Sequence, residues 1–473
     1  MAELTHRRRL LVLAICCMSL LIVSLDNTVL NVALPSLRRE LGAGVAGMQW
    51  TIDAYTLVLA SLLMLAGSTA DRIGRRKVFV TGLVLFTLGS VLCSLAPHLT
   101  ALVAFRMVQA VGGSMLNPVA MSIITNTFTE PRARARAIGV WGGVVGISMA
   151  AGPLVGGVLT DTVGWRAIFW LNVPIGLTAL LLTLRYVPES RAPRPRRADP
   201  VGQLLVIVLL GSLTYAIIES DPRVAALAVL ALLGLLVYEP RRPEPLVDLR
   251  FFRSAPFSGA TVIAVCAFAA LAGFLFLNTL YLQDVRGMDA LEAGLHMLPM
   301  AALTFVCAPL SGRLVGSFGP RPSLLVAGVA MTASGVLFAA FGAESSTPLL
   351  FTGYVLFGLG FGMVNAPITD TAVAGMPREQ AGVAAAVAST SRQIGQTLGV
   401  AVIGTVLASG VSPAFRAEGF AAASRPAWWI VAACGLSVLA VGAATSGAWA
   451  RGTAERTARR LKEAARPSAR TDA

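Results

Sequence analysis

The sequence has few charged residues, few histidines and few cysteines for its 473 residues. Asp, Glu, Lys and Arg make up 13%, whereas a soluble protein carries about 25%. The six cysteines all lie inside apolar stretches and the three histidines are isolated, so we expect no disulfide framework and no metal site. No Gly-x-x-x-x-Gly-Lys phosphate loop occurs, and no nucleophile is grouped with a base. These absences argue against direct ATP drive and against an enzyme, and we expect no cofactor.

The sequence is instead rich in long runs of apolar residues. Hydrophobic residues make up 56% of the chain, and a membrane-spanning helix needs roughly 20 of them in a row. The first run continues past Val23 without a small-residue cleavage site, so we interpret it as a retained helix rather than a signal peptide. The sequence predicts an all-α polytopic membrane protein with fourteen spans, at 10–34, 48–66, 78–96, 100–125, 137–159, 167–184, 201–218, 224–238, 257–282, 294–315, 323–341, 349–368, 381–408 and 428–449.

The distribution of Lys and Arg fixes an expected orientation. If the N-terminus is cytoplasmic, 29 of the 38 basic residues fall in cytoplasmic segments and seven in outer loops. Such an excess is the positive-inside signal of a membrane protein. The net charge of +14 is therefore explained by topology, and we expect no nucleic-acid partner. Both termini are predicted to be cytoplasmic, with the tail from residue 451 lying along the membrane surface.

A weak internal repeat predicts two related halves. Gly312 and Gly319 repeat the spacing of Gly67 and Gly74 at an offset of 245 residues, and the first and ninth predicted helices begin 247 residues apart. Duplicated halves place the substrate site of a transporter between them. We therefore expect an N-terminal six-helix bundle (1–187), a linker with two inserted helices (188–255), a C-terminal six-helix bundle (256–450) and a cytoplasmic tail (451–473).

Polar residues inside the first two helices are candidate site residues. Asp26, Asn27 and Asn31 interrupt the first apolar run and share one face at 100° per residue. A charge within the membrane is costly and usually faces a cavity or a partner, so we favour a functional role over a structural polar patch. Asp53 lies close to the outer end of the second helix, where it is a substrate-cavity residue or simply solvated.

The helix predicted at 100–125 carries a second polar stripe. Its members share one side of the helix and are Arg106, Gln109, Gly113 and Asn117. An arginine at this depth needs a carboxylate, a carbonyl or water. We expect Asp26 as its partner, with Asp53 as the second choice. In the helix predicted at 381–408, Arg392 and Gln396 are expected to face the same cavity.

Two glycine-containing motifs complete the candidate set. The charged stretch 67–77 is predicted to be a tight turn in which Asp71 meets guanidinium groups. Its predicted latch residues are Gly67, Asp71, Arg72, Gly74, Arg75 and Arg76. The helix predicted at 137–159 contains a close-packing stretch formed by Gly152, Pro153, Gly156 and Gly157. A plain packing seam is the alternative for this second motif.

These motifs together resemble the major facilitator superfamily. The stretch 67–77 is similar to its signature loop between helices 2 and 3, and 152–157 is similar to its antiporter motif. The stretch 25–35 (Leu-Asp-Asn-Thr-Val-Leu-Asn-Val-Ala-Leu-Pro) resembles the helix 1 motif of the fourteen-helix drug:proton antiporters, the branch of multidrug and methylenomycin-resistance exporters. The resemblance ties an acid at Asp53 to cationic substrates and Arg106 to proton transfer.

The resemblance implies a proton-coupled antiporter that exports drug-like or antibiotic compounds by alternating access. Asp26 and Arg106 are the expected proton-coupling residues. The expected partners are a small-molecule substrate, protons and the bilayer of a bacterial inner membrane, with the protein acting as a monomer. A proton-coupled importer of a small solute on the same fold remains an alternative, and so does a channel or membrane sensor.

Overall fold

The computed structural model describes residues 5–192, 199–242, 244–342, 346–374, 376, 378–410 and 417–465. Within these ranges, 14 helices are long and apolar enough to cross a membrane, which confirms the predicted number. The prediction of an all-α fold is confirmed as well, since the described chain contains helices and no strand. Residues 193–198 of the expected linker and 466–473 of the expected tail lie outside the described ranges.

The helices follow one another along the chain as α1 (His6–Leu41), α2 (Val45–Ile73), α3 (Arg75–Ser94), α4 (Leu99–Thr127), α5 (Pro131–Thr162), α6 (Ala167–Trp170), α7 (Asn172–Tyr186), α8 (Pro200–Ile218), α9 (Pro222–Tyr238), η1 (Glu239–Arg241), η2 (Leu249–Arg253), α10 (Ala255–Leu280), η3 (Tyr281–Val285), α11 (Ala290–His296), α12 (Leu298–Phe318), α13 (Pro320–Ala339), α14 (Thr347–Val373), α15 (Arg378–Gly410), α16 (Ala417–Thr445) and α17 (Ala448–Ala465).

Three predicted spans contain a break in the structure, and the end of a fourth, 48–66, is too early because α2 continues to Ile73. The sixth predicted span is broken at Leu171 into α6 and α7. The predicted span 294–315 joins the end of α11 to α12, although Met297 separates these helices and Pro299 lies in the first turn of α12. The predicted span 428–449 runs past Thr445 into α17 and misses the first part of α16. Apolar composition alone does not reveal such breaks, because the residues on both sides are hydrophobic.

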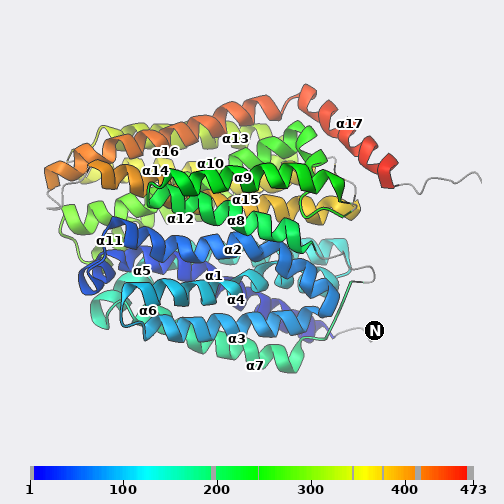
Figure 1. Ribbon diagram of the computed structural model, residues 1–473, viewed down its shortest axis with the longest axis horizontal. Coiled ribbons are helices and arrows are strands. Elements are labelled where there is room, and N and C mark those ends of the chain that lie inside the picture. The colour runs from blue at the N-terminus through cyan, green and yellow to red at the C-terminus, as the bar shows by residue number, and fades with distance from the viewer. Residues whose placement is uncertain are drawn as a thin grey trace, which may run out of the picture.

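The long helices form two groups (Figure 1). Helices α1–α7, here the N-half, occupy the lower part of the view, and α10–α16, the C-half, the upper part. The pair α8 and α9 lies in front, and α8 contacts both α2 and α15. We call the end of the molecule where α1 ends the Leu41 end, and the end where α1 begins and α17 lies the α17 end.

The two halves are joined by polar contacts at the Leu41 end. Gln49 of α2 donates hydrogen bonds through Nε2 to the carbonyl oxygens of Val400 and Ala401 on α15, at 3.2 and 2.7 Å. The carboxylate of Asp161 accepts hydrogen bonds from the backbone N–H groups of Ala290 and Leu291, at 3.2 and 2.7 Å. These contacts close the N-half against the C-half at this end.

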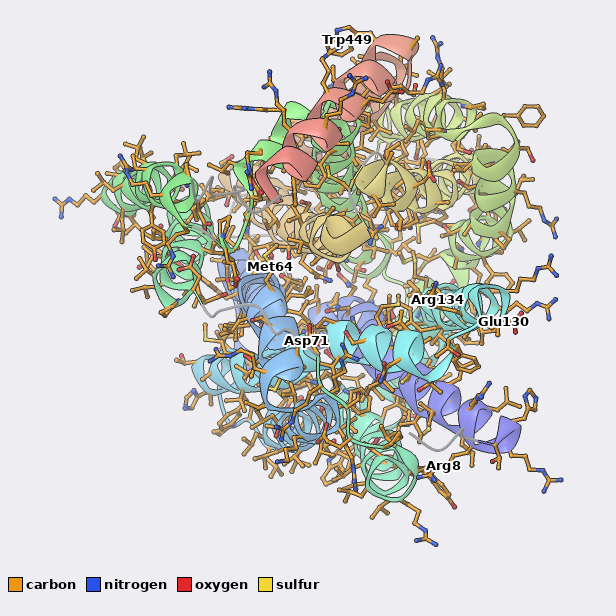
Figure 2. All side chains as sticks on the ribbon, turned by 90° about the vertical axis from the view of Figure 1, so that its right-hand side faces the viewer. Arg8, Met64, Asp71, Glu130, Arg134 and Trp449 are labelled. Carbon is orange, nitrogen blue, oxygen red and sulfur yellow. The ribbon has the colours of Figure 1, made fainter. Side chains whose placement is uncertain are left out.

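The α17 end is more open between α5 and α12. A Cβ atom added at Gly142 or Gly143 of α5, or at Gly312 or Gly316 of α12, would meet no atom within 4 Å. Figure 2 looks onto this end, where Met64 of α2 packs against a small apolar cluster formed by residues of η2, α10, α15 and α17. The two halves therefore touch along α2 and α15, and α5 also contacts α12, where a Cβ atom built on Gly146 would lie 3.0 Å from the ring of Phe305. The open positions at Gly142 and Gly143 lie one helical turn from this contact, toward the α17 end.

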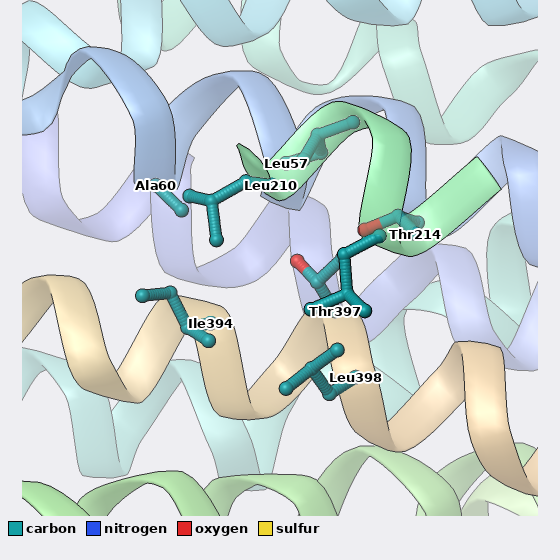
Figure 3. Close-up of a pocket in the computed structure, with 8 residues that line it drawn as sticks. Leu57, Ala60, Leu210, Thr214, Ile394, Thr397 and Leu398 are labelled. Atoms are coloured by element: carbon teal, nitrogen blue, oxygen red, sulfur yellow. The ribbon is translucent and has the colours of Figure 1, made fainter. Parts of the chain in front are cut away.

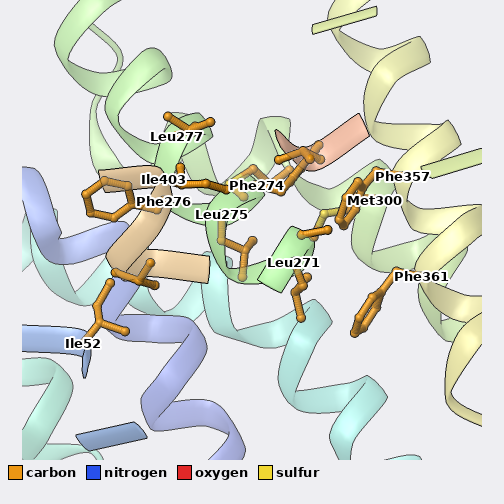
Figure 4. Packing of buried hydrophobic residues seen from close by; sticks show 14 of the residues in the cluster. Ile52, Leu271, Phe274, Leu275, Phe276, Leu277, Met300, Phe357, Phe361 and Ile403 are labelled. Atoms are coloured by element: carbon orange, nitrogen blue, oxygen red, sulfur yellow. The ribbon is translucent and has the colours of Figure 1, made fainter. Parts of the chain in front are cut away.

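Aromatic side chains fill the core of the C-half. The ring of Phe274 on α10 stacks on Phe357 of α14 with centroids 3.9 Å apart, and Trp428 of α16 meets its edge at 5.6 Å (Figure 4). Burying a side chain of this size stabilises a fold by about 1.5–3 kcal/mol in water. In a bilayer the tight interlocking of such rings supplies the stabilisation instead, since lipid tails are equally apolar.

Candidate functional site

A buried ion pair joins α1 to α4. Arg106 of α4 contacts the Oδ2 atom of Asp26 of α1 through Nη1, and the two side chains are 0% and 2% exposed. The Nε atom of Arg106 donates to the carbonyl oxygen of Thr51 on α2 at 3.2 Å. Its guanidinium also lies over the ring of Tyr55, 4.3 Å from the ring centre. The predicted pairing of Arg106 with Asp26, rather than with Asp53, is therefore present in this structure.

Neutral side chains surround the other oxygen of Asp26. Gln109 of α4 and Asn172 of α7 each donate to Oδ1 of Asp26, at 2.8 Å. Gln109 also donates to the hydroxyl of Ser90 on α3 at 2.9 Å and accepts from Arg106 at 2.8 Å. The buried polar network of the N-half, by which we mean Asp26, Ser90, Arg106, Gln109 and Asn172, thus links four helices through one carboxylate.

Close helix packing makes this network possible. A Cβ atom at Gly89 of α3 would lie 2.6 Å from the Cα atom of Gln109, which is closer than real Cβ contacts. Only glycine lets α3 approach α4 this closely, and the approach brings Ser90 within reach of Gln109. Asn172 reaches Asp26 because the break at Leu171 starts a new helix at this point. Sequence reasoning missed both Ser90 and Asn172; the sequence itself shows Asn172 only as an isolated amide inside an apolar run.

The three polar residues predicted to share one face of α1 do not make the same contacts. Asp26 belongs to the network, whereas the amide of Asn31 donates to the backbone oxygen of Asn27 at 2.7 Å. Asn31 is 9% exposed, and Asn27 is partly exposed. The three residues are neighbours on α1, but only Asp26 takes part in the network.

Asp53 is not solvated, contrary to one of the two interpretations of the sequence. Its side chain is 0% exposed, and neither carboxylate oxygen has a hydrogen-bond partner among the described residues. It lies four residues after Gln49 and three before Thr56 on α2. Thr56 accepts a hydrogen bond from Thr397 of α15 at 2.9 Å, so this side of α2 faces the C-half. Asp53 is enclosed at the contact of the two halves rather than in an open cavity.

The inserted helix α8 covers the same contact. Leu57 and Ala60 of α2, Leu210 of α8, and Ile394 and Thr397 of α15 line a small, mostly apolar pocket where the three helices meet (Figure 3). The polar lining of this pocket is small, and none of its residues is charged. The pocket is therefore too small for a drug-like compound, and Thr214 and Thr397 are the only polar residues that line it.

Further polar atoms without a partner lie on α4 and α15. The amide oxygens of Asn117, Gln393 and Gln396 are buried and have no hydrogen-bond partner among the described residues. Arg392 donates through Nη2 to the hydroxyl of Thr369 on α14 at 2.6 Å. Sequence reasoning had proposed Asn117, Arg392 and Gln396 as cavity residues. The structure leaves these three with hydrogen-bonding capacity to spare, and it adds Gln393.

The charged stretch 67–77 contains a shorter turn than the sequence predicts, because its first seven residues belong to α2. Helix α2 continues to Ile73, so Gly67 lies inside the helix, and the turn is confined to Gly74, which has a positive φ of 128°. Such a backbone angle favours glycine because other residues meet steric clashes there. Asp71 accepts hydrogen bonds from Nε and Nη2 of Arg75 at 3.0 and 2.9 Å. The predicted contact of Asp71 with an arginine is therefore present, and the arginine is the one four residues further along the chain.

A residue that sequence reasoning missed completes this stretch. Glu189, in the segment after α7, accepts a hydrogen bond from the backbone N–H of Arg76 at 3.0 Å. The guanidinium of Arg76 donates to the carbonyl oxygen of Leu184 at 2.5 Å. Arg72, which is another predicted latch residue, is exposed in the structure. The loop thus connects α2 and α3 to the end of α7.

The glycine stretch of α5 lies where the halves touch. A Cβ atom at Gly152 would lie 2.0 Å from the hydroxyl oxygen of Thr28 on α1, and one at Gly157 would lie 2.5 Å from the Cα atom of Leu291 on α11. Gly156 packs against Val29 of α1 in the same way, at 3.0 Å from its carbonyl oxygen. The carbonyl of Pro153 in turn lies 2.4 Å from a Cβ built on Gly294. The motif therefore seals α5 against α1 and α11 near the Leu41 end.

Among the described residues, no group of three or more His, Cys, Asp or Glu side chains is arranged to hold a metal ion. The six cysteines are free thiols in the structure. The chemistry that the site offers is therefore ion pairing, hydrogen bonding and proton exchange at a carboxylate.

Comparison with known proteins bears on what this arrangement does. Residues 16–400 match the Major Facilitator Superfamily. The chain is 38% identical over 417 residues to the multidrug resistance protein Stp of Mycobacterium tuberculosis, covering 86% of this chain and 77% of that protein. It is 38% identical to the tetracenomycin C resistance and export protein of Streptomyces glaucescens, covering 84% and 75%. It is 34% identical to the methylenomycin A resistance protein of Streptomyces coelicolor, covering 86% and 90%.

Solved structures agree on the fold. A bacterial homologue of the human lysosomal transporter Spinster, in an inward-facing and occupied conformation, matches with a TM-score of 0.62 at 19% identity, covering 98% of this chain and all of that one. The family and its relatives are membrane transporters rather than enzymes. With its 14 candidate spans and with relatives named as multidrug-resistance and antibiotic-resistance proteins, the chain belongs to the Major Facilitator Superfamily and is a multidrug-resistance efflux transporter by similarity.

Proposed function

We propose that this transporter exports drug-like or antibiotic compounds in exchange for protons. The observation that carries the proposal is the Asp26–Arg106 pair, a carboxylate held by a cation and two amides inside the N-half. An ionisable side chain in the middle of a membrane is costly unless it has a task or a partner. The names of the relatives, which include multidrug resistance and antibiotic export, support the choice of substrate class.

The proposed proton step changes what Asp26 can accept. As a carboxylate it is an acceptor only and matches three donors, from Arg106, Gln109 and Asn172. Addition of a proton removes the negative charge and turns one oxygen into a donor, which no longer matches a guanidinium N–H. The contact between α1 and α4 then weakens, and the balance between the two conformations of the transporter shifts.

We propose that the conformational change separates the halves at the Leu41 end and joins them at the α17 end. The moving units are 1–187 and 256–450, with 188–255 connecting them. Asp71, Arg75 and Glu189 tie the end of α2 to α3 and α7, so they hold the N-half as one body while it moves. The glycine stretch 152–157 supplies a close contact that forms only when the Leu41 end is closed.

The α17 end and both termini are proposed to face the cytoplasm, because the segments that the sequence assigns to the cytoplasm hold 29 of the 38 basic residues. In a bacterial inner membrane, the conformation described here then opens toward the cytoplasm, as an exporter needs when it collects its substrate. Asn27, Asn117, Gln393 and Gln396, which carry unused hydrogen-bonding capacity or exposed surface, are the proposed substrate contacts in this conformation.

The test uses inverted membrane vesicles that contain the protein and an imposed proton gradient, acid inside. A panel of antibiotics and dyes is added, and the release of protons from the vesicles is followed with a pH-sensitive dye. We expect at least one compound to be taken up with proton release, and vesicles without the protein to show neither. Uptake of no compound, or uptake that is indifferent to the gradient, contradicts the proposal. Uptake that needs the opposite gradient indicates an importer.

A further inference from the structure

Resting on the proposed export function, we infer that Arg392 selects substrates that carry an acidic group, such as a carboxylate, sulfonate or enolate, on a planar aromatic frame. Arg392 lies near the middle of α15, and its guanidinium reaches across to α14, where Nη2 donates to the hydroxyl of Thr369 at 2.6 Å. The hydroxyl is a neutral acceptor and leaves the positive charge of the guanidinium uncompensated.

No carboxylate neutralises Arg392 within the described part of the chain. The ion pairs found there all involve other arginines: Arg38, Arg75, Arg106, Arg166 and Arg250. Asp370 follows Thr369 on α14, but successive helical residues point about 100° apart, and the two groups are not within 4.0 Å. The Nε atom of Arg392 is buried and has no hydrogen-bond partner. A cation with an unused donor at this depth calls for an anionic partner.

The other charges in the middle of the spans are not available to a substrate. Asp26 and Arg106 neutralise each other and are 2% and 0% exposed at their side chains. Asp53 on α2 is 0% exposed. Arg392 as a residue is half-buried rather than buried, so of these four charged residues it is the one that a compound can approach. We therefore expect an anionic substrate, whereas the resemblance ties an acid at Asp53 to cationic substrates.

The surroundings of Arg392 suit a flat aromatic ring. Its guanidinium carbon lies 5.9 Å from the centre of the Phe268 ring on α10. Phe268 meets Phe361 of α14 edge to face, with centroids 5.2 Å apart. The unpartnered amide oxygens of Gln393 and Gln396 lie on the same helix as Arg392. Aromatic faces beside an arginine and two amides can bind a ring system that carries an acid and one or two hydroxyl or amine donors.

The experiment compares two dyes that share one aromatic skeleton. Anilinonaphthalenesulfonate carries a sulfonate, and phenylnaphthylamine lacks it. Binding of each to the purified full-length protein in detergent is measured by fluorescence titration, with empty micelles as the blank. We expect the wild type to bind the sulfonate more tightly than the neutral dye, by on the order of tenfold, which is the value of one charge-assisted hydrogen bond. Arg392→Gln should abolish this preference, and Arg392→Lys should retain part of it.

Asp370→Asn is the matched control, because it removes the neighbouring charge without touching Arg392. It should keep the preference for the sulfonate. Equal affinities of the wild type for both dyes, no binding of the sulfonate, or an unchanged preference in Arg392→Gln each overturns the inference. Loss of the preference in Asp370→Asn also overturns it, because the two residues would then act as a pair. Proton release by the wild type with a neutral compound would still uphold proton-coupled export, so the two proposals fail separately.

Discussion

Gln109 and Asn172, which lie on different helices, both donate a hydrogen bond to the same oxygen of Asp26, and both distances are 2.8 Å. The opposite oxygen contacts Arg106. The carboxylate is thus enclosed by donors from α4 and α7, and none of these donors comes from the C-half. Events at Asp26 can therefore alter the packing of the N-half directly, and they reach the C-half only through movement of whole helices.

Replacing Asn172 should impair proton-coupled transport while leaving substrate binding in place. Asn172→Leu keeps the approximate size but removes one donor, and a lost hydrogen bond to a charged group costs about 1.5–3 kcal/mol. We expect proton-driven export to fall by about tenfold or more. Exchange of labelled for unlabelled compound, which needs no net proton movement, should fall less. Thr178→Val on the exposed side of α7 is the control, and equal behaviour of both variants would show that Asn172 has no special role.

Arg106 should not be replaceable by lysine. A lysine keeps the charge but lacks the planar fork that reaches Asp26, Gln109 and the carbonyl of Thr51 together. Arg106→Lys should therefore lose most proton-driven export. Arg106→Ala leaves the carboxylate buried without its cation, which destabilises a protein by about 3–5 kcal/mol, and its melting temperature in detergent should fall further than that of the lysine variant. Wild-type export by Arg106→Lys would mean that a point charge suffices.

Glu189 should matter as much as Asp71 for the rate of conformational change. Glu189→Gln weakens the contact with the backbone of Arg76, and Asp71→Asn weakens the contact with Arg75. Both variants should bind substrate with nearly the wild-type Kd but turn over more slowly, because the N-half no longer moves as one body. Arg72→Gln, at an exposed position of the same stretch, should turn over normally. A normal rate in Glu189→Gln would remove this residue from the proposed latch.

Gly157 and Gly142 provide matched positions on one helix. Gly157→Ala places a Cβ 2.5 Å from the Cα of Leu291, whereas Gly142→Ala meets nothing within 4 Å. The first change should oppose closure of the Leu41 end, and the second should be neutral. The measurement is labelling of a cysteine at Ala290, which is 2% exposed, by a membrane-impermeant maleimide in a background without the native cysteines. Faster labelling in Gly157→Ala alone is expected; equal labelling contradicts the assigned role of the motif.

Much of this fold can be predicted from the sequence, because a long apolar run in a membrane has to form a helix that satisfies its own backbone hydrogen bonds. The spans, their number and the pairing of Asp26 with Arg106 follow from hydropathy and from the cost of burying a charge. The break at Leu171 does not follow, since the residues around it are as apolar as those inside a helix. Without that break Asn172 looks like an isolated amide, and its contact with Asp26 cannot be foreseen.

Other parts of the site depend on which helices touch. Asp53 was expected near the outer end of a helix, but its exposure depends on whether α15 covers it, and hydropathy says nothing about neighbours. Glu189 lies 113 residues from Arg76, and a single sequence gives no sign of a contact over that separation. Gly67 was assigned to a turn because glycine often ends a helix; here helix α2 continues through it for six more residues.

The central claim is that Asp26 exchanges the proton that drives export. Its most direct test measures substrate-dependent proton release from inverted vesicles that contain the wild type, Asp26→Asn or, as the matched control, Asp221→Asn at the N-cap of α9, where asparagine is an equally good cap. Membrane levels of the three proteins are equalised by immunoblot. The account predicts proton release with the wild type and with Asp221→Asn, and none with Asp26→Asn. Undiminished proton release by Asp26→Asn would contradict it.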